Sequence, residues 1–229
     1  MSQKYYAEQK CWEIISIPKG VSNGTPCDLD QVRQLREKVG ALSWISKETR
    51  VDLAGSVALL MQAFPCPSIG DLKTCNKILK EAQLYKDLGI TIRPIAPENL
   101  CIVVSSDAAW ANAKDQEGDH KSQAGYIMLS TDRQMLQGRE TMFSMLTWKS
   151  HTLKRRTVST LSAETQAIAE SAAVACWFRN LMAEMFYKDL LSNGSIDWET
   201  MLEPLEFGIV TDAKSVYALL QHQEIHFQH

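Results

Sequence analysis

The fold is decided by the stretch LCIVVSSD, residues 100–107, in which an unbroken apolar run ends on a carboxylate. An apolar run of this length without alternation is typical of a strand that is buried on both faces. Further elements follow in the order strand, strand, long helix, strand and short helix. Their predicted ranges are 124–130, 143–150, 159 to about 187, 205–211, and 212 to about 222.

This order of elements predicts an α/β fold with a mixed sheet. Three strands in series favour an antiparallel meander. The later alternation of strand and helix favours a parallel strand added to that meander.

The residues before the sheet predict a separate helical segment. Apolar residues recur there at steps of three and four, which is the spacing of a buried helix face. The three stripes lie within 28–42, 53–64 and 72–82. The expected helix starts are Asp28 or Asp30, then Thr49 or Asp52, then Gly70-Asp71.

A connector bracketed by prolines at about 94–99 divides the chain. It predicts two domains, 1–98 and 99–229. Short strands are also expected within the first domain, at 12–17 and 89–93.

Composition sets limits on the class of protein. The 229 residues are 45% hydrophobic and 22% charged, as in a globular protein, and the net charge of −3 excludes nucleic-acid binding through bulk positive charge. The six cysteines form no CxxC pair and match no zinc spacing, so we expect buried or free thiols. No apolar run is long enough for a membrane span and the polar N-terminus is not a signal peptide. We expect a cytoplasmic or nuclear protein with no membrane partner, not a secreted one.

Three carboxylates lie where a predicted strand ends or a predicted helix begins. Asp107 directly follows the first strand, Asp212 directly follows the fourth, and open α/β sheets carry their sites at the carboxyl ends of strands. Glu164 lies near the start of the alanine-rich helix, on a line of small and apolar residues that we expect to face the sheet. That line continues through Ile168, Ser171 and Ala175. A carboxylate on such a face is costly unless it is paired, hydrogen-bonded or bound to a metal.

These carboxylates have two interpretations. Each aspartate taken singly is an ordinary loop or N-cap residue. Together, on this order of elements, the three favour a metal site. Hard oxygen ligands suit Mg²⁺ or Mn²⁺, and two such ions can activate a water and stabilise the leaving oxygen of a phosphodiester.

Short motifs in this order resemble one family, the polyproteins of copia-type LTR retrotransposons. In the first part the matching motifs are GALSWI at 40–45 and TRVDLA at 49–54. In the second part they are SDAAWA at 106–111, KSQAGY at 121–126, WKS at 148–150, STLSAE at 159–164 and TDAKS at 211–215. The chain thus resembles the thumb or connection segment of a reverse transcriptase over 1–98, followed by a ribonuclease H domain over 99–229.

The resemblance implies a fold, a substrate and roles for the carboxylates. It implies a ribonuclease H-like mixed sheet of order β-β-β-α-β-α, and hydrolysis of the RNA strand of an RNA–DNA hybrid with two Mg²⁺ (or Mn²⁺) ions. Asp107 would bridge both ions, while Glu164 and Asp212 would hold one each. The family supplies a fourth carboxylate from a later strand and helix, and nothing in 221–229 matches that segment. We therefore expect a domain that lacks its last strand and helix and has weakened activity, as one part of a reverse transcriptase polyprotein.

One basic run lies between the third predicted strand and the long helix. Its candidate nucleic-acid-binding residues are Trp148, Lys149, His151, Lys154, Arg155 and Arg156. Lysine and arginine here could hold the phosphates of a hybrid, with Trp148 beside the backbone. The alternative is a solvated loop.

Two other functions remain open from the sequence. The chain could be an inactive retrotransposon remnant that at most binds nucleic acid. It could also be a structural connection module of a reverse transcriptase.

Overall fold

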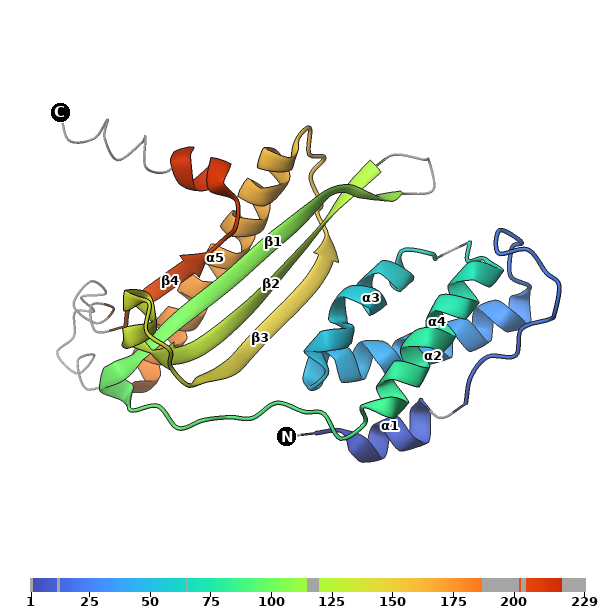
Figure 1. Cartoon of the computed structure of the whole chain (residues 1–229), viewed down its shortest axis with the longest axis horizontal. Helices are drawn as coiled ribbons and strands as arrows, with labels where there is room; N and C mark the ends of the chain where they lie inside the picture. The colour runs from blue at the N-terminus through green and yellow to red at the C-terminus, as the bar shows by residue number, and fades with distance from the viewer. Residues whose placement is uncertain are drawn as a thin grey trace. The chain divides into compact units, whose positions relative to one another are not determined.

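The computed structural model describes residues 2–11, 13–64, 66–114, 120–186, 202 and 205–219. The chain forms two compact units, the first made mainly of residues up to Ile90 and the second mainly of residues from Thr91 onwards (Figure 1).

The first unit is helical. Its helices are α1 Lys4–Lys10, α2 Leu29–Glu48, α3 Val51–Met61 and α4 Ile69–Leu84. The three predicted stripes supply its core, since residues such as Leu35, Leu53 and Leu72 are fully buried within one cluster. Helix α1 was not predicted from the sequence.

The observed helix start agrees with the prediction at α2 and, to within one residue, at α4. Asp28 caps α2, and its carboxylate accepts the backbone N–H of Gln31 at 2.8 Å. Helix α4 begins one residue earlier than expected, with a capping box between Ser68 and Asp71. The prediction for α3 was wrong, because Thr49 ends α2 and the N-cap is Arg50, which makes no side-chain cap.

Neither predicted short strand forms in the first unit. Among the described residues of 12–17 the backbone belongs to no strand, because Asn76 of α4 satisfies both polar groups of Ile15 at 2.8 Å. In 89–93 the strand pairing consists of one isolated bridge, between Ser2 and Gly89. Ile15 and Ile17 of the first run pack in the helical core, whereas Ile92 of the second run is 64% exposed.

The second unit contains a mixed sheet and one long helix. The strands are β1 Leu100–Lys114, β2 His120–Asp132, β3 Phe143–Thr152 and β4 Phe207–Val210, and the helix is α5 Thr160–Phe186. The strand order is β3-β2-β1-β4, with β2 antiparallel and β4 parallel to β1. Short 3₁₀ helices, Pro97–Asn99 and Arg133–Gln137, precede β1 and follow β2.

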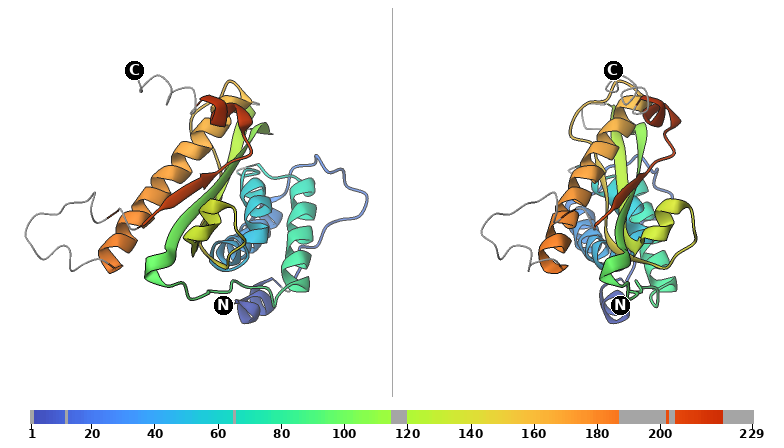
Figure 2. Two further views of the ribbon diagram at one scale, coloured as in Figure 1. Left: turned by 60° about the vertical axis from the view of Figure 1, so that its left-hand side comes forward. Right: turned by 90° about the vertical axis from the view of Figure 1, so that its left-hand side faces the viewer.

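This arrangement confirms the predicted α/β class and the ribonuclease H-like mixed sheet. The meander and the added parallel strand lie in the predicted order, and α5 runs along the sheet (Figure 2). Residues 214–219 are helical, while the predicted continuation of that helix to about residue 222 lies outside the described residues.

The core of the second unit lies between the sheet and α5. Ile102 and Val104 of β1 pack with Met128 of β2 and Ala175 of α5. A second cluster nearer the start of α5 consists of Ala108, Ala124, Leu153, Ala163 and Ala167. Alanine at these positions leaves room for the helix backbone to approach the strands closely.

Candidate metal centre

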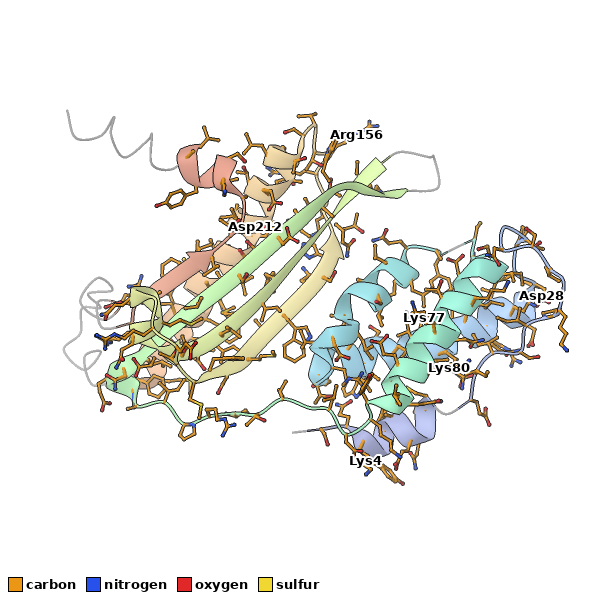
Figure 3. The ribbon with its side chains drawn as sticks, viewed as in Figure 1. Lys4, Asp28, Lys77, Lys80, Arg156 and Asp212 are labelled. Atoms are coloured by element: carbon orange, nitrogen blue, oxygen red, sulfur yellow. The ribbon has the colours of Figure 1, made fainter. Side chains whose placement is uncertain are left out.

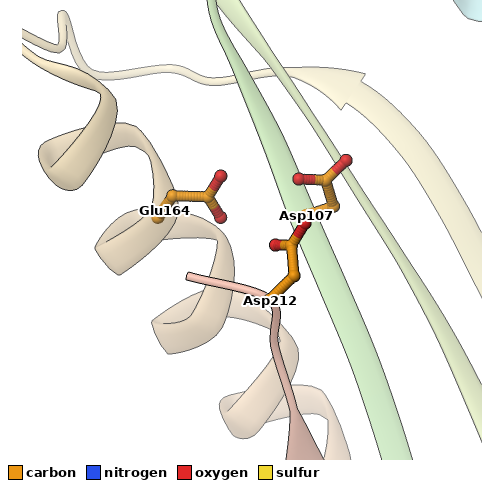
Figure 4. Close-up of side chains that lie close together, drawn as sticks. All are labelled: Asp107, Glu164 and Asp212. Carbon is orange, nitrogen blue, oxygen red and sulfur yellow. The ribbon is translucent and has the colours of Figure 1, made fainter. Parts of the chain in front are cut away.

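Asp107, Glu164 and Asp212 converge in the second unit. Each offers a carboxylate oxygen, and these three oxygens lie within 4.8 Å of one another (Figure 4). The side chains come from β1, from α5 and from the segment after β4. The spatial prediction from the sequence is therefore confirmed for all three residues.

The parallel pairing of β1 and β4 brings the two aspartates together. Ser105 of β1 pairs with Val210 of β4 at the end of this ladder. Asp107 and Asp212 each follow two residues later. The two aspartates lie equally far beyond the last pair of this parallel ladder, so their carboxylates lie side by side.

The sequence predicted that Asp107 directly follows the first strand, and this was wrong. It lies within β1, opposite Gly125 of β2. The apolar run stops at residue 106, but the strand continues because its later residues still pair with β2. Alanine and polar residues in a half-exposed strand do not produce the apolar signal on which that prediction relied.

Glu164 reaches the cluster from the second turn of α5. Its side chain is only 7% exposed, and Ser171 and Ala175 on the same line of the helix are fully buried. The prediction that this line faces the sheet is confirmed for these residues, although Ile168 is only half-buried.

The electrostatics of Glu164 favour a bound cation. Burial raises the pKa of its carboxyl, the charges of Asp107 and then Asp212 raise it further, and a hydrogen bond with the backbone of Ala108 lowers it in part. Its Oε2 is buried with no hydrogen-bond partner among the described residues. A buried carboxylate oxygen that faces two more carboxylates is costly without a neutralising partner.

The donor set therefore fits a divalent metal ion. Carboxylate oxygens are hard ligands, as Mg²⁺, Mn²⁺ and Ca²⁺ prefer. One ion among the three would remove both the mutual repulsion and the unmet hydrogen-bonding capacity of Glu164. The cluster could hold such an ion.

The basic run is divided between two elements. Trp148, Lys149 and His151 belong to β3, whereas Lys154, Arg155 and Arg156 are exposed in the loop between β3 and α5. Their contact with nucleic acid stays a prediction.

Three residues that the sequence did not indicate hold this loop in place. They are Trp110, Ser122 and Thr157, which are linked by hydrogen bonds. No pattern in the sequence indicates these links, because they depend on an irregularity within β1.

Comparisons with known proteins add little. No family model matches the chain, and no curated protein matches it. Among solved structures, the chain is similar to a foamy viral protease-reverse transcriptase in complex with an RNA/DNA hybrid, with 12% identity and a TM-score of 0.24 over 71% of this chain. The match spans 27% of that protein's chain. The strand order β3-β2-β1-β4 and the helix α5 along the sheet define the fold.

Among the helices that the structure describes, none combines the length and the apolar character of a membrane span.

Proposed function

We propose that the second unit is a metal-dependent ribonuclease H-like domain that hydrolyses the RNA strand of RNA–DNA hybrids. The observation that carries this proposal is the convergence of Asp107, Glu164 and Asp212, with a buried and unsatisfied oxygen on Glu164. In this proposal residues 99–229 are the ribonuclease H-like part and 1–98 are the thumb or connection segment of a copia-type reverse transcriptase. The order of the sequence motifs supports this family origin.

The three carboxylates would hold Mg²⁺ or Mn²⁺. A bound divalent ion lowers the pKa of water and stabilises charge on a leaving phosphodiester oxygen. Asp107 and Asp212 are exposed, so their oxygens are accessible from the solvent side of the site, where a substrate would lie. Glu164 is held in place by its helix and by burial. It would therefore fix the position of a metal ion bound between the three carboxylates.

Substrate binding would fall to the basic run. Lys154, Arg155 and Arg156 would contact phosphates, because all three are exposed directly before the helix that carries Glu164. Trp148, Lys149 and His151 of β3 would extend this surface.

Activity is expected to be weak in Mg²⁺. The described residues bring three carboxylates to the cluster, whereas the family that the chain resembles uses four. Mg²⁺ requires near-octahedral geometry and sheds its waters reluctantly, so a site with fewer ligands holds it weakly. A loss of about 3–4 kcal/mol in the barrier corresponds to ~10²–10³ in rate.

The test is cleavage of an RNA–DNA hybrid labelled on its RNA strand, in Mg²⁺, in Mn²⁺ and in EDTA. We expect slow, metal-dependent cleavage that falls at least ~10²-fold in Asp107→Asn, Glu164→Gln and Asp212→Asn. Glu184→Gln is the matched control, since Glu184 is exposed on the same helix as Glu164. Cleavage that survives Glu164→Gln would contradict the proposal. Hybrid binding without any cleavage would instead support the inactive remnant.

A further inference from the structure

Strand β1 contains a bulge three residues after Asp107. Ala109 pairs with Gln123 of β2, but the next pair is Ala113 with Lys121, so β1 carries two extra residues. Within them Ala111 has a φ of +53°, the one positive value at a non-glycine residue in the part of the chain that the structure describes. Such a conformation is uncommon for alanine, and bulges of this kind re-aim side chains next to functional sites.

The bulge directs Trp110 to the basic loop. Its indole N–H donates to the backbone carbonyl of Thr157 at 3.2 Å. The residue as a whole is still 48% exposed, so Trp110 is not an ordinary core residue. This hydrogen bond joins β1, the strand of Asp107, to Thr157, the residue that directly follows the cations at 154–156.

Ser122 of β2 completes this connection. Its hydroxyl oxygen accepts the backbone N–H of Ala111 at 3.1 Å and lies 2.6 Å from the hydroxyl of Thr157. Its backbone carbonyl accepts the N–H of Leu153 at 2.8 Å. One buried serine therefore contacts the bulge and both ends of the loop.

The loop is thus fixed at both ends while its middle faces solvent. Leu153 is 3% exposed and packs against Ala108 and Ala163. Between Leu153 and Thr157 lie three consecutive exposed cations, the last of them Arg156 (Figure 3). A loop that is already ordered loses less conformational entropy when it binds a ligand.

We propose that Trp110 is a positioning residue that holds the cationic loop 154–156 beside β1, and that the loop so held binds the phosphate backbone of a nucleic acid. This inference rests on the proposed function and adds the element that seats the substrate. The whole chain carries a net charge of −3, so backbone binding must come from a local, correctly placed group of cations. The indole N–H then acts on the substrate only through the loop.

The first test measures the loop itself and needs no activity. Trp110→Phe keeps an aromatic ring and removes the N–H donor, whereas Thr157→Val removes the hydroxyl next to Ser122. We expect trypsin to cleave at 154–156 about fivefold faster in each variant, as loss of about 1 kcal/mol of hydrogen bonding predicts. Trp44→Phe is the matched control, since Trp44 is 52% exposed on α2, and it should leave this cleavage unchanged. Equal cleavage of the wild-type chain and both loop variants would overturn the positioning role.

The second test measures affinity for a fluorescently labelled RNA–DNA hybrid at several salt concentrations. Trp110→Phe should weaken binding several-fold and reduce the dependence of log Kd on log salt. The change should vanish when Lys154, Arg155 and Arg156 are already replaced by glutamine, because Trp110 acts only through these three cations. An undiminished Trp110→Phe effect in that background would overturn the inference.

Kinetics separate this inference from the proposed hydrolysis. In a cleaving protein Trp110→Phe should raise KM and leave kcat within about twofold, unlike Asp107→Asn. If the chain cleaves no hybrid but the affinity measurements give the expected changes, the proposed hydrolysis is wrong and the positioning role of Trp110 stands. If the wild-type chain binds no hybrid near physiological salt, the inference is wrong.

Discussion

Glu164 is the residue at which burial and charge conflict most strongly. A buried carboxylate beside Asp107 and Asp212 is tolerable only if something else neutralises it. Folded without metal, the chain holds that repulsion as a cost in stability. Functional sites commonly carry such a cost.

Glu164→Gln should therefore stabilise the metal-free chain. The amide keeps the shape, removes one buried charge and can donate to the neighbouring carboxylates. We expect a higher Tm in EDTA, by ~2–4 °C for each kcal/mol gained, in a thermal scan. Glu184→Gln should leave the Tm unchanged. A lower Tm for Glu164→Gln in EDTA would mean that its charge is compensated by groups within the protein.

The cysteines give a prediction on pH. Burial raises the pKa of Cys75 from 9.0 to about 12, and burial, followed by nearby acidic groups, raises that of Cys101 to about 11. In the unfolded chain both thiols ionise near 9, so between pH 9 and about 11–12 the native state binds more protons. Stability is then fully present below pH 9 and should fall above it, by at most about 1.4 kcal/mol per pH unit for each thiol.

Thiol labelling checks the same burial. At pH 8 in the native state the exposed Cys66 and Cys176 should react quickly, and the buried Cys11, Cys75 and Cys101 should react only after unfolding. Urea melts at pH 8 and pH 10.5 complete the test. Equal stability at both pH values would contradict the burial of these thiols.

At the scale of elements, the side chain of Arg50 links α3 to α4 in the first unit. Its side chain is 3% exposed, pairs with Asp52 at 2.7 Å and donates to the carbonyls of Ala82 and Tyr85 at the end of α4. Arg50→Met should lower the free energy of unfolding by about 2–3 kcal/mol, because it leaves those two carbonyls without a donor and removes a buried guanidinium from its pair with the partly exposed Asp52.

Urea unfolding followed by circular dichroism measures this loss. Arg33→Met is the matched control, since the Arg33–Asp30 pair lies on the exposed face of α2 and contributes little. Equal losses for the two variants would show that Arg50 is not a structural link.

Arg179 similarly links α5 to the segment that precedes β4. Its guanidinium donates to the carbonyls of Leu205 and Leu202 at 2.6 and 2.7 Å and lies over the ring of Phe207. Arg179→Met should destabilise the second unit by about 1–3 kcal/mol and loosen the strand that leads to Asp212. We expect Arg179→Met to bind Mn²⁺ more weakly than the control Asn180→Ala, since Asn180 is an exposed neighbour on the same helix. Equal Mn²⁺ affinity in the two variants would show that the position of β4 does not affect the metal centre.

At the scale of the whole molecule, most of the architecture follows from the sequence pattern. Periods of three to four residues in 28–82 predict the helices because each reflects one buried helix face. The apolar runs after residue 100 predict the sheet because they reflect strands that are buried on both faces. Strand order predicts that Asp107 and Asp212 lie together, and the small, apolar line of α5 predicts that Glu164 faces the sheet.

The remainder depends on contacts that no local pattern encodes. The side chain of Asn76 forms hydrogen bonds with the backbone N–H and carbonyl of Ile15, so the segment around Ile15 does not pair as a strand. The bulge that directs Trp110 to the loop arises from pairing between strands, and its alanines and polar residues also occur in regular strands. Tertiary contacts thus decide these details.

Binding of Mn²⁺ is the measurement that tests the metal centre most directly. Free Mn²⁺ gives an electron paramagnetic resonance signal that falls when the ion is bound, so titration of the chain yields affinity without any need for turnover. We predict saturable binding by the wild-type chain and by Glu184→Gln, and at least tenfold weaker binding by Asp107→Asn, Glu164→Gln and Asp212→Asn. Equal affinity in all five proteins, or no saturable binding by the wild-type chain, would contradict a metal centre at these three carboxylates.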